Sequence, residues 1–171
     1  EKVTVGSVPY FGLLENNVGY VKLRSFTRNC SNDLKNAILK LKEQSATSLI
    51  LDLRGNPGGL LNESVKIANF FVNQGEDIVS TKGKIKSWEK VYTATSKPID
   101  TEIPLVVLID QSSASASEIV SGSLQDLDRA VIVGKRSFGK GLVQQTRKLS
   151  YNSQLKLTVA KYYIPSGRCI Q

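Results

Sequence analysis

Histidine is absent from the 171 residues of this chain. Most hydrolytic sites use imidazole as their base, so this absence excludes a Ser-His-Asp triad, a Cys-His pair and an HExxH zinc site. If the chain activates a hydroxyl group, the base must be a lysine or a carboxylate. Long apolar runs are absent as well, because none approaches the ~20 residues that a membrane-spanning helix needs.

Cysteine is scarce. The two cysteines, Cys30 and Cys169, lie near opposite ends of the chain and lack the spacing of metal ligands. We therefore expect two unpaired thiols and no metal site. A disulfide between these cysteines remains open only for an oxidising compartment.

The overall composition is that of an ordinary globular domain. Hydrophobic residues make up 40% of the chain and charged residues 22%. A chain of this length buries roughly 70% of its unfolded surface, which favours one domain with a sizeable core. The net charge of +8 raises nucleic acid or an anionic surface as a partner. The basic residues are spread along the whole chain, however, so no nucleic-acid partner is predicted.

Short apolar runs alternate with helical periodicity. Buried strands are predicted at 49–53, 103–109 and 130–133, the first of them buried on both faces. Three amphipathic helices are expected, the first capped by Ser31 and the second with an apolar face formed by Leu61, Val65, Ala68 and Val72. The polar stretch 75–101 is interpreted as a hairpin-like excursion, and alternation at 155–159 predicts an edge or antiparallel strand. The chain is therefore an α/β fold with a largely parallel sheet.

A serine-rich segment follows the strand at 103–109. Ser115 and Glu118 match the S-x-x-E capping box, which gives Ser115 a purely structural interpretation. A nucleophile at the same place is also chemically sensible, because the free N–H groups of a helix start stabilise an oxyanion. In that case Ser112 or Ser113 would take the cap.

Lys140 is held between two glycines. Its structural interpretation is a surface lysine in a turn. Its chemical interpretation is a general base, which requires a neutral amine, whereas an unperturbed lysine has a pKa near ~10.4 and loses its proton readily only when buried. Gln144, four residues on, orients such an amine without adding a charge, or is an ordinary polar strand residue.

The turn from Arg54 to Gly59 is rich in glycine. It lacks the GxGxxG and GxxxxGK[ST] spacings of a phosphate cradle. We interpret it as a flexible backbone in which Gly58 or Gly59 presents an N–H group to an oxyanion. In an open α/β sheet, this turn and the Ser115 segment both fall beyond the carboxyl ends of strands, where ligands bind.

In their order and spacing, these residues resemble the carboxy-terminal processing peptidases, or tail-specific proteases, a family of Ser-Lys endopeptidases. The resemblance covers nearly the whole chain and is carried by Gly19-Tyr20-Val21 with Leu23 and Phe26, by Asp52 to Gly59, by Ser113 to Ile119 with Gln125-Asp126 and Arg129-Ala130, and by Gly134 with Phe138 to Gly141, Val143 and Gln144.

By position in these motifs, the resemblance implies that Ser115 is the nucleophile, Lys140 the general base and Gln144 the residue that orients it. Ala116 and either Gly58 or Gly59 are implied as the oxyanion donors.

The resemblance also implies a crotonase/ClpP-like core, with an additional antiparallel edge or hairpin beside the largely parallel sheet. Members cut proteins near unstructured, apolar C-terminal tails, without ATP, metal or another cofactor. They work outside the cytoplasm, in a periplasm, cell envelope or organelle lumen. We expect residues 1–171 to be a single catalytic core, without the PDZ domain and the C-terminal continuation of the family, and any membrane or envelope association to involve other regions.

Two other functions are compatible with such a fold. One is a catalytically silent peptide-binding or scaffold module. The other is a crotonase-like acyl-CoA enzyme, which would need a carboxylate base and CoA-binding features that the sequence does not reveal.

Overall fold

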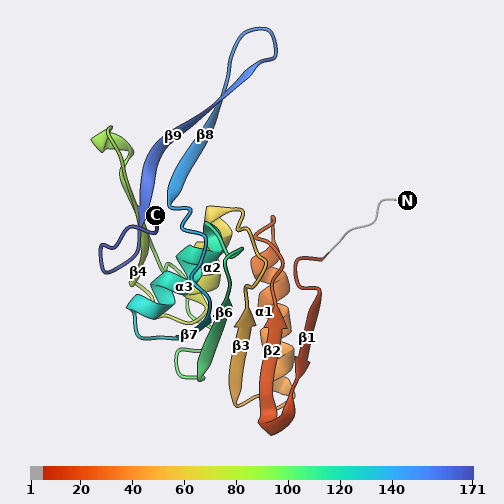
Figure 1. Cartoon of the computed structure of the whole chain (residues 1–171). Helices are drawn as coiled ribbons and strands as arrows, with labels where there is room; N and C mark the ends of the chain where they lie inside the picture. The colour runs from red at the N-terminus through yellow and green to blue at the C-terminus, as the bar shows by residue number, and fades with distance from the viewer. Residues whose placement is uncertain (1–5) are drawn as a thin grey trace.

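The computed structural model describes residues 6–171 and places the predicted buried strands in one sheet (Figure 1). Four of its strands are parallel, and the first strand pairs antiparallel with the second. This confirms the largely parallel sheet. The strand order is β1 (Tyr10–Leu13), β2 (Val18–Lys22), β3 (Ser48–Asp52), β6 (Leu105–Ile109) and β7 (Val131–Gly134), with a short 3-10 turn, η1 (Glu15–Asn17), between β1 and β2.

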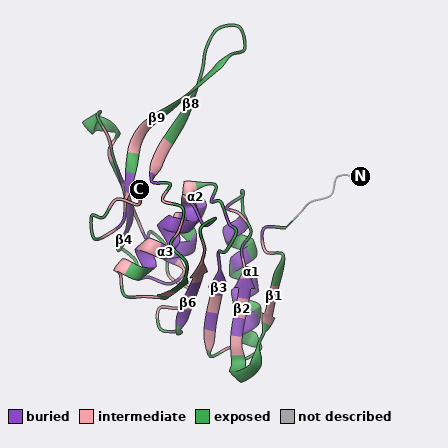
Figure 2. Ribbon diagram, in the orientation of Figure 1, coloured by how far each residue is buried: buried purple, intermediate pink, exposed green. Residues whose placement is uncertain are grey.

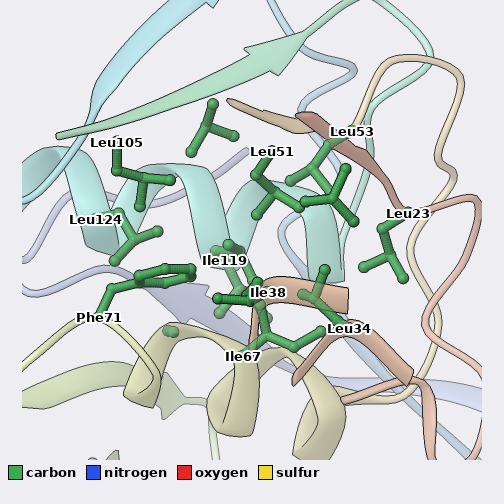
Figure 3. Packing of buried hydrophobic residues seen from close by; sticks show 14 of the residues in the cluster. Leu23, Leu34, Ile38, Leu51, Leu53, Ile67, Phe71, Leu105, Ile119 and Leu124 are labelled. Carbon is green, nitrogen blue, oxygen red and sulfur yellow. The ribbon is translucent and has the colours of Figure 1, made fainter. Parts of the chain in front are cut away.

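Three helices supply the other half of the core, namely α1 (Cys30–Glu43), α2 (Leu61–Asn69) and α3 (Ala116–Asp126). Figure 3 shows Leu51 and Leu105 of the sheet packed against Ile38, Ile67 and Ile119 of the helices. The alternate residues of β3 and β6, such as Ile50 and Val106, are only half-buried. The prediction that β3 is buried on both faces is therefore wrong, because only one face of the sheet receives the helices.

A second, antiparallel sheet stands beside the first. Its order is β5 (Lys90–Thr93), β4 (Asp77–Lys82), β9 (Gln154–Tyr163) and β8 (Leu142–Lys148), and the short 3-10 turn η2 (Lys86–Trp88) joins β4 to β5. The hairpin-like excursion and the antiparallel strand at 155–159 are thus confirmed. In Figure 1 the β8–β9 hairpin projects from the body, and Figure 2 shows that most of its outer part is exposed.

One local prediction about the helices is wrong. The N-cap of α1 is Asn29 rather than Ser31, which lies buried in the first turn. Its backbone N–H donates to the Glu63 carboxylate of α2 at 2.9 Å, so another helix supplies the capping acceptor. The predicted apolar face of α2 is confirmed, because Ala68 and Val72 are buried and Leu61 and Val65 are half-buried and pack against the core.

The strand predicted at 130–133 is present as β7, but it is an edge strand. Val131 is 64% exposed and Val133 46% exposed, because side chains alternate along a strand and only Ile132 between them packs against the core. Within residues 6–171, no strand pairs with the outer side of β7. The apolar run at 130–133 therefore predicted the strand correctly, but the prediction that this strand is buried is wrong.

Both cysteines have free thiols in the structure, as the expectation of two unpaired thiols requires. Cys30 is buried, and its Sγ lies 3.6 Å from Oε2 of Glu63. Burial, together with the negative charge of Glu63, raises the pKa of the Cys30 thiol to about 12. Cys169 is half-buried near the other end of the chain. Within residues 6–171, no helix is long and apolar enough to cross a membrane.

Candidate active site

Ser115 lies where β6 has ended and α3 begins. It is the N-cap of α3 and forms the predicted capping box with Glu118. Its backbone has φ 55° and ψ −110°, a conformation that costs a non-glycine residue about 1–3 kcal/mol. Such strain persists only where the surrounding structure enforces it, and strained residues cluster at functional sites. The capping position of Ser115 therefore does not exclude a reactive role.

The neighbouring serine is structural. Ser113 Oγ donates to the carbonyl of Leu53 at 2.8 Å and accepts the backbone N–H of Asp110 at 2.9 Å. The Asp110 carboxylate in turn accepts the N–H groups of Gly55 and Ser112. These bonds join the ends of β3 and β6, so Ser113 positions the turn that carries Ser115 and does not take the cap.

Asn56 is fully buried and connects the glycine-rich turn to the Ser115 segment. Its Nδ2 donates to the carbonyl of Leu23 at 2.9 Å, and its own carbonyl accepts Ser117 Oγ at 2.9 Å and the N–H of Ala114 at 3.1 Å. The Asn56 Oδ1 atom accepts the N–H of Gly58 at 2.9 Å. This last bond occupies the Gly58 N–H inside the loop.

Two N–H groups beside Ser115 remain open. Within residues 6–171, neither the N–H of Ala116 nor that of Gly59 has a hydrogen-bond acceptor. Gly59 also forms a bridge with Phe26, which fixes its backbone. Sequence reasoning left Gly58 and Gly59 as equal candidates for the oxyanion donor, and the geometry favours Gly59 because the Gly58 N–H is already used.

The predicted base lies on the turn that precedes β8. The N–H of Phe138 donates to the carbonyl of Ser113 at 3.0 Å, so this turn runs beside the Ser115 segment. The side chains of Lys140 and Gln144 are exposed. No hydrogen bond joins either of them to Ser115 in the described part of the chain. The structure thus brings the backbone of Lys140 beside the Ser115 segment without a hydrogen bond from its amine to Ser115. Gln144 lies in β8, directly after a β-bulge between Val143 and Gln144.

Glu118 is the residue whose connections sequence reasoning missed. Its carboxylate accepts the N–H groups of Ser115 at 2.7 Å, Gly139 at 2.6 Å and Lys140 at 2.9 Å. The capping-box motif predicts only the hydrogen bond between Glu118 and the Ser115 N–H. The other two join residues far apart in the sequence, and no local pattern announces them.

The start of the glycine-rich turn is fixed by a buried carboxylate. Asp52 accepts Tyr20 Oη at 2.5 Å and a bidentate pair from Arg54, at 3.0 and 2.7 Å. Burial alone would raise the pKa of Asp52, but the hydrogen bonds from Arg54 and Tyr20 and the nearby Lys22 outweigh it, so the pKa falls to about 2. The folded state therefore favours the ionised carboxylate.

We expect Asp52→Asn to lower the free energy of unfolding at neutral pH by about 2 kcal/mol. The sign follows from the lowered pKa: the contribution of Asp52 is complete above about pH 4 and is lost as the pH falls through about 2. Urea unfolding of the full-length protein at several pH values measures this effect. The exposed Glu76→Gln variant is the control, and an Asp52→Asn deficit that does not shrink between pH 4 and 2 would contradict the prediction.

Comparison with known proteins identifies the class to which this fold and site belong. The model of peptidase family S41 matches residues 17–171, and the chain belongs to that family. The chain is homologous to carboxy-terminal processing proteases: it is 44% identical over 162 residues to the carboxy-terminal-processing protease of Bartonella bacilliformis, covering 92% of this chain and 37% of the relative.

Comparison with solved structures identifies the same class of protein. The photosystem II D1 C-terminal processing protease superposes with a TM-score of 0.87 at 35% identity, over 100% of this chain and 47% of that protein. Mature CPAF, at 14% identity and a TM-score of 0.70, shares the fold. The mixed α/β fold with a largely parallel sheet and an added antiparallel sheet is therefore that of S41 proteases. The chain spans less than half the length of these relatives.

Proposed function

We propose that the protein containing this chain is a serine endopeptidase that cleaves other proteins near unstructured, apolar C-terminal tails, without ATP or metal. The observation that carries this proposal is the strained Ser115 at the start of α3, beside the open N–H groups of Ala116 and Gly59. Membership of peptidase family S41 and the names of the relatives, which process carboxy termini, support the reaction and the substrate class.

In the proposed reaction, Ser115 Oγ attacks the scissile carbonyl as its proton passes to the neutral amine of Lys140. The N–H groups of Ala116 and Gly59 donate to the oxyanion that forms. The C–N bond then breaks, the proton passes from Lys140 to the leaving amine, and an acyl-enzyme remains on Ser115. Water hydrolyses this ester by the same proton route, and Gln144 orients the lysine.

The reaction requires a movement of the Lys140 side chain. That side chain is exposed and makes no hydrogen bond to Ser115 within residues 6–171. In the active conformation we expect Lys140 Nζ about 2.6–3.2 Å from Ser115 Oγ. The backbone of the turn already lies beside the nucleophile, so rotation of one side chain and closure around substrate bring the two atoms together.

Exposed apolar side chains near the site suit an apolar tail. Leu60, which follows the glycine pair, is 48% exposed, and Phe138, next to the Lys140 turn, is 67% exposed. Exposed apolar residues at a site mark contact with a partner when they gather there. We propose protein or peptide substrates, an extracytoplasmic location, and membrane or envelope association, if any, through regions outside this chain.

The test is cleavage of an unfolded protein by the full-length enzyme and by its Ser115→Ala variant, without ATP and with a chelator present. We expect cleavage by the wild type only. Cleavage by both proteins would remove Ser115 as the nucleophile. The lack of a hydrogen bond between the Lys140 amine and Ser115 within residues 6–171 favours a second candidate, a silent binding module, and binding of the tail by both proteins without cleavage would establish it.

A further inference from the structure

The carboxylate of Glu118 gathers three backbone donors from two separate turns. Oε2 accepts the N–H of Ser115 at 2.7 Å and that of Lys140 at 2.9 Å, and Oε1 accepts the N–H of Gly139 at 2.6 Å. Glu118 is only 4% exposed. A single side chain therefore joins the turn of the proposed nucleophile to the turn of the proposed base.

A helix cap explains only one of these bonds. The Ser115 bond is half of the capping box, whereas the Gly139 and Lys140 bonds reach across to the segment that leads into β8. Glu118 also forms no ion pair with a lysine or arginine in the described residues. A buried carboxylate is costly unless it is well hydrogen-bonded, and these three N–H groups offset the cost of burying Glu118. Displacement of either turn would leave the buried side chain of Glu118 with too few hydrogen-bond donors.

The bond to Ser115 also has a chemical consequence. Because the Ser115 N–H is directed into the protein towards Glu118, it cannot serve the oxyanion. The next N–H along the chain, that of Ala116, is the one left open at the helix start. Glu118 thus selects which N–H of the turn serves substrate.

We propose that Glu118 is a positioning residue that holds the Ser115 turn and the Lys140 turn in one fixed relation. This inference rests on the proposed Ser-Lys mechanism, and it goes beyond it by assigning the element that keeps nucleophile and base in register. Glu118 acts through the backbone and touches neither substrate nor the reacting atoms.

The arrangement requires both the charge and the length of glutamate. The three backbone N–H groups donate to the two carboxylate oxygens of Glu118, and both oxygens act as acceptors. In Glu118→Gln one oxygen becomes an NH2 group, so at least one backbone N–H meets a donor in either orientation of the amide. In Glu118→Asp the side chain is one methylene shorter and cannot span both turns.

We expect Glu118→Gln in the full-length protein to lower kcat on a peptide substrate by about 10–100-fold, the usual result of misplacing catalytic groups. KM should stay within about twofold, because Glu118 does not touch substrate. Amide hydrogen exchange gives a readout without activity: the amides of Gly139 and Lys140 should exchange about 10–100-fold faster, as expected for loss of hydrogen bonds to a charged acceptor.

The matched control is Glu63→Gln. Glu63 is also 4% exposed and accepts the backbone N–H of Ser31 at 2.9 Å near the start of α1, and in residues 6–171 it forms no hydrogen bond to the Ser115 turn or the Lys140 turn. We expect this variant to lose stability and keep kcat. Wild-type kcat in Glu118→Gln, equal losses of kcat in both variants, or unchanged exchange at Gly139 and Lys140 would each overturn the proposal. Equal cleavage by the wild type and Ser115→Ala would instead overturn the proposed function.

Discussion

Lys140→Arg in the full-length protein is expected to lower kcat/KM on a peptide substrate by about 10²–10⁴-fold, the contribution of a general base. Arginine keeps the positive charge and approximate length of lysine, but it is not deprotonated in proteins and cannot accept the Ser115 proton. The chain contains no histidine to replace the lost base. The measurement is steady-state cleavage, with binding of the substrate to each variant measured separately.

Lys135→Arg is the matched control, because Lys135 is also exposed and lies on the same connection between β7 and β8. Its activity should equal that of the wild type. If Lys140→Arg cleaves at a near-normal rate, Lys140 supplies only positive charge, and a carboxylate must be sought as the base.

The second large effect is expected at Gly58. Its φ is +96°, and a Cβ atom built on it lies 2.5 Å from the carbonyl oxygen of Ala114 and 2.9 Å from both the N atom of Ala116 and Cβ of Ser115. Gly58→Ala therefore combines an unfavourable backbone conformation with a collision against the nucleophile turn. We expect a loss of about 2–4 kcal/mol in the free energy of unfolding.

The same substitution should lower kcat/KM by about 10²–10³-fold, because the collision displaces Ser115 and the Ala116 N–H, which the proposed reaction uses as an oxyanion donor. Gly55→Ala separates strain from collision, because Gly55 also has a positive φ of 73° but has no atom within 4 Å of a built Cβ. That variant should lose only about 1 kcal/mol. Equal losses of stability in the two variants would mean that the close packing of Gly58 against Ser115 is unimportant.

Local patterns were sufficient for most of the fold. The apolar run at Leu49–Leu53 and the helical periodicity after Ser115 describe single segments, and each predicted an element that is present. Burial was harder to predict, because it depends on what covers a face. The same kind of run is buried on one face only in β3 and is largely exposed in β7, an edge strand.

In the site, too, local motifs were predictable and contacts between distant segments were not. Motif order pointed to Ser115, Lys140 and Gln144, and their roles remain predictions. The proposal of Gly59 over Gly58 as an oxyanion donor rests on the position of the Asn56 side chain, which accepts the Gly58 N–H and not that of Gly59. The full role of Glu118 required contacts with Gly139 and Lys140, two donors that a capping motif does not contain.

The unequal environments of the two cysteines have a practical consequence. A thiolate is the reactive form of cysteine, and a pKa of about 12 keeps the buried Cys30 protonated at neutral pH. Cys169 is the thiol of this domain that a labelling reagent reaches. It pairs with Tyr163 of β9, and the two residues that follow it pass so close to Gly141 that a Cβ built there lies 2.7 Å from the N atom of Gln171. A fluorophore on Cys169 would therefore sit beside the segment that leads from Lys140 into β8, where its emission would follow movement of that turn.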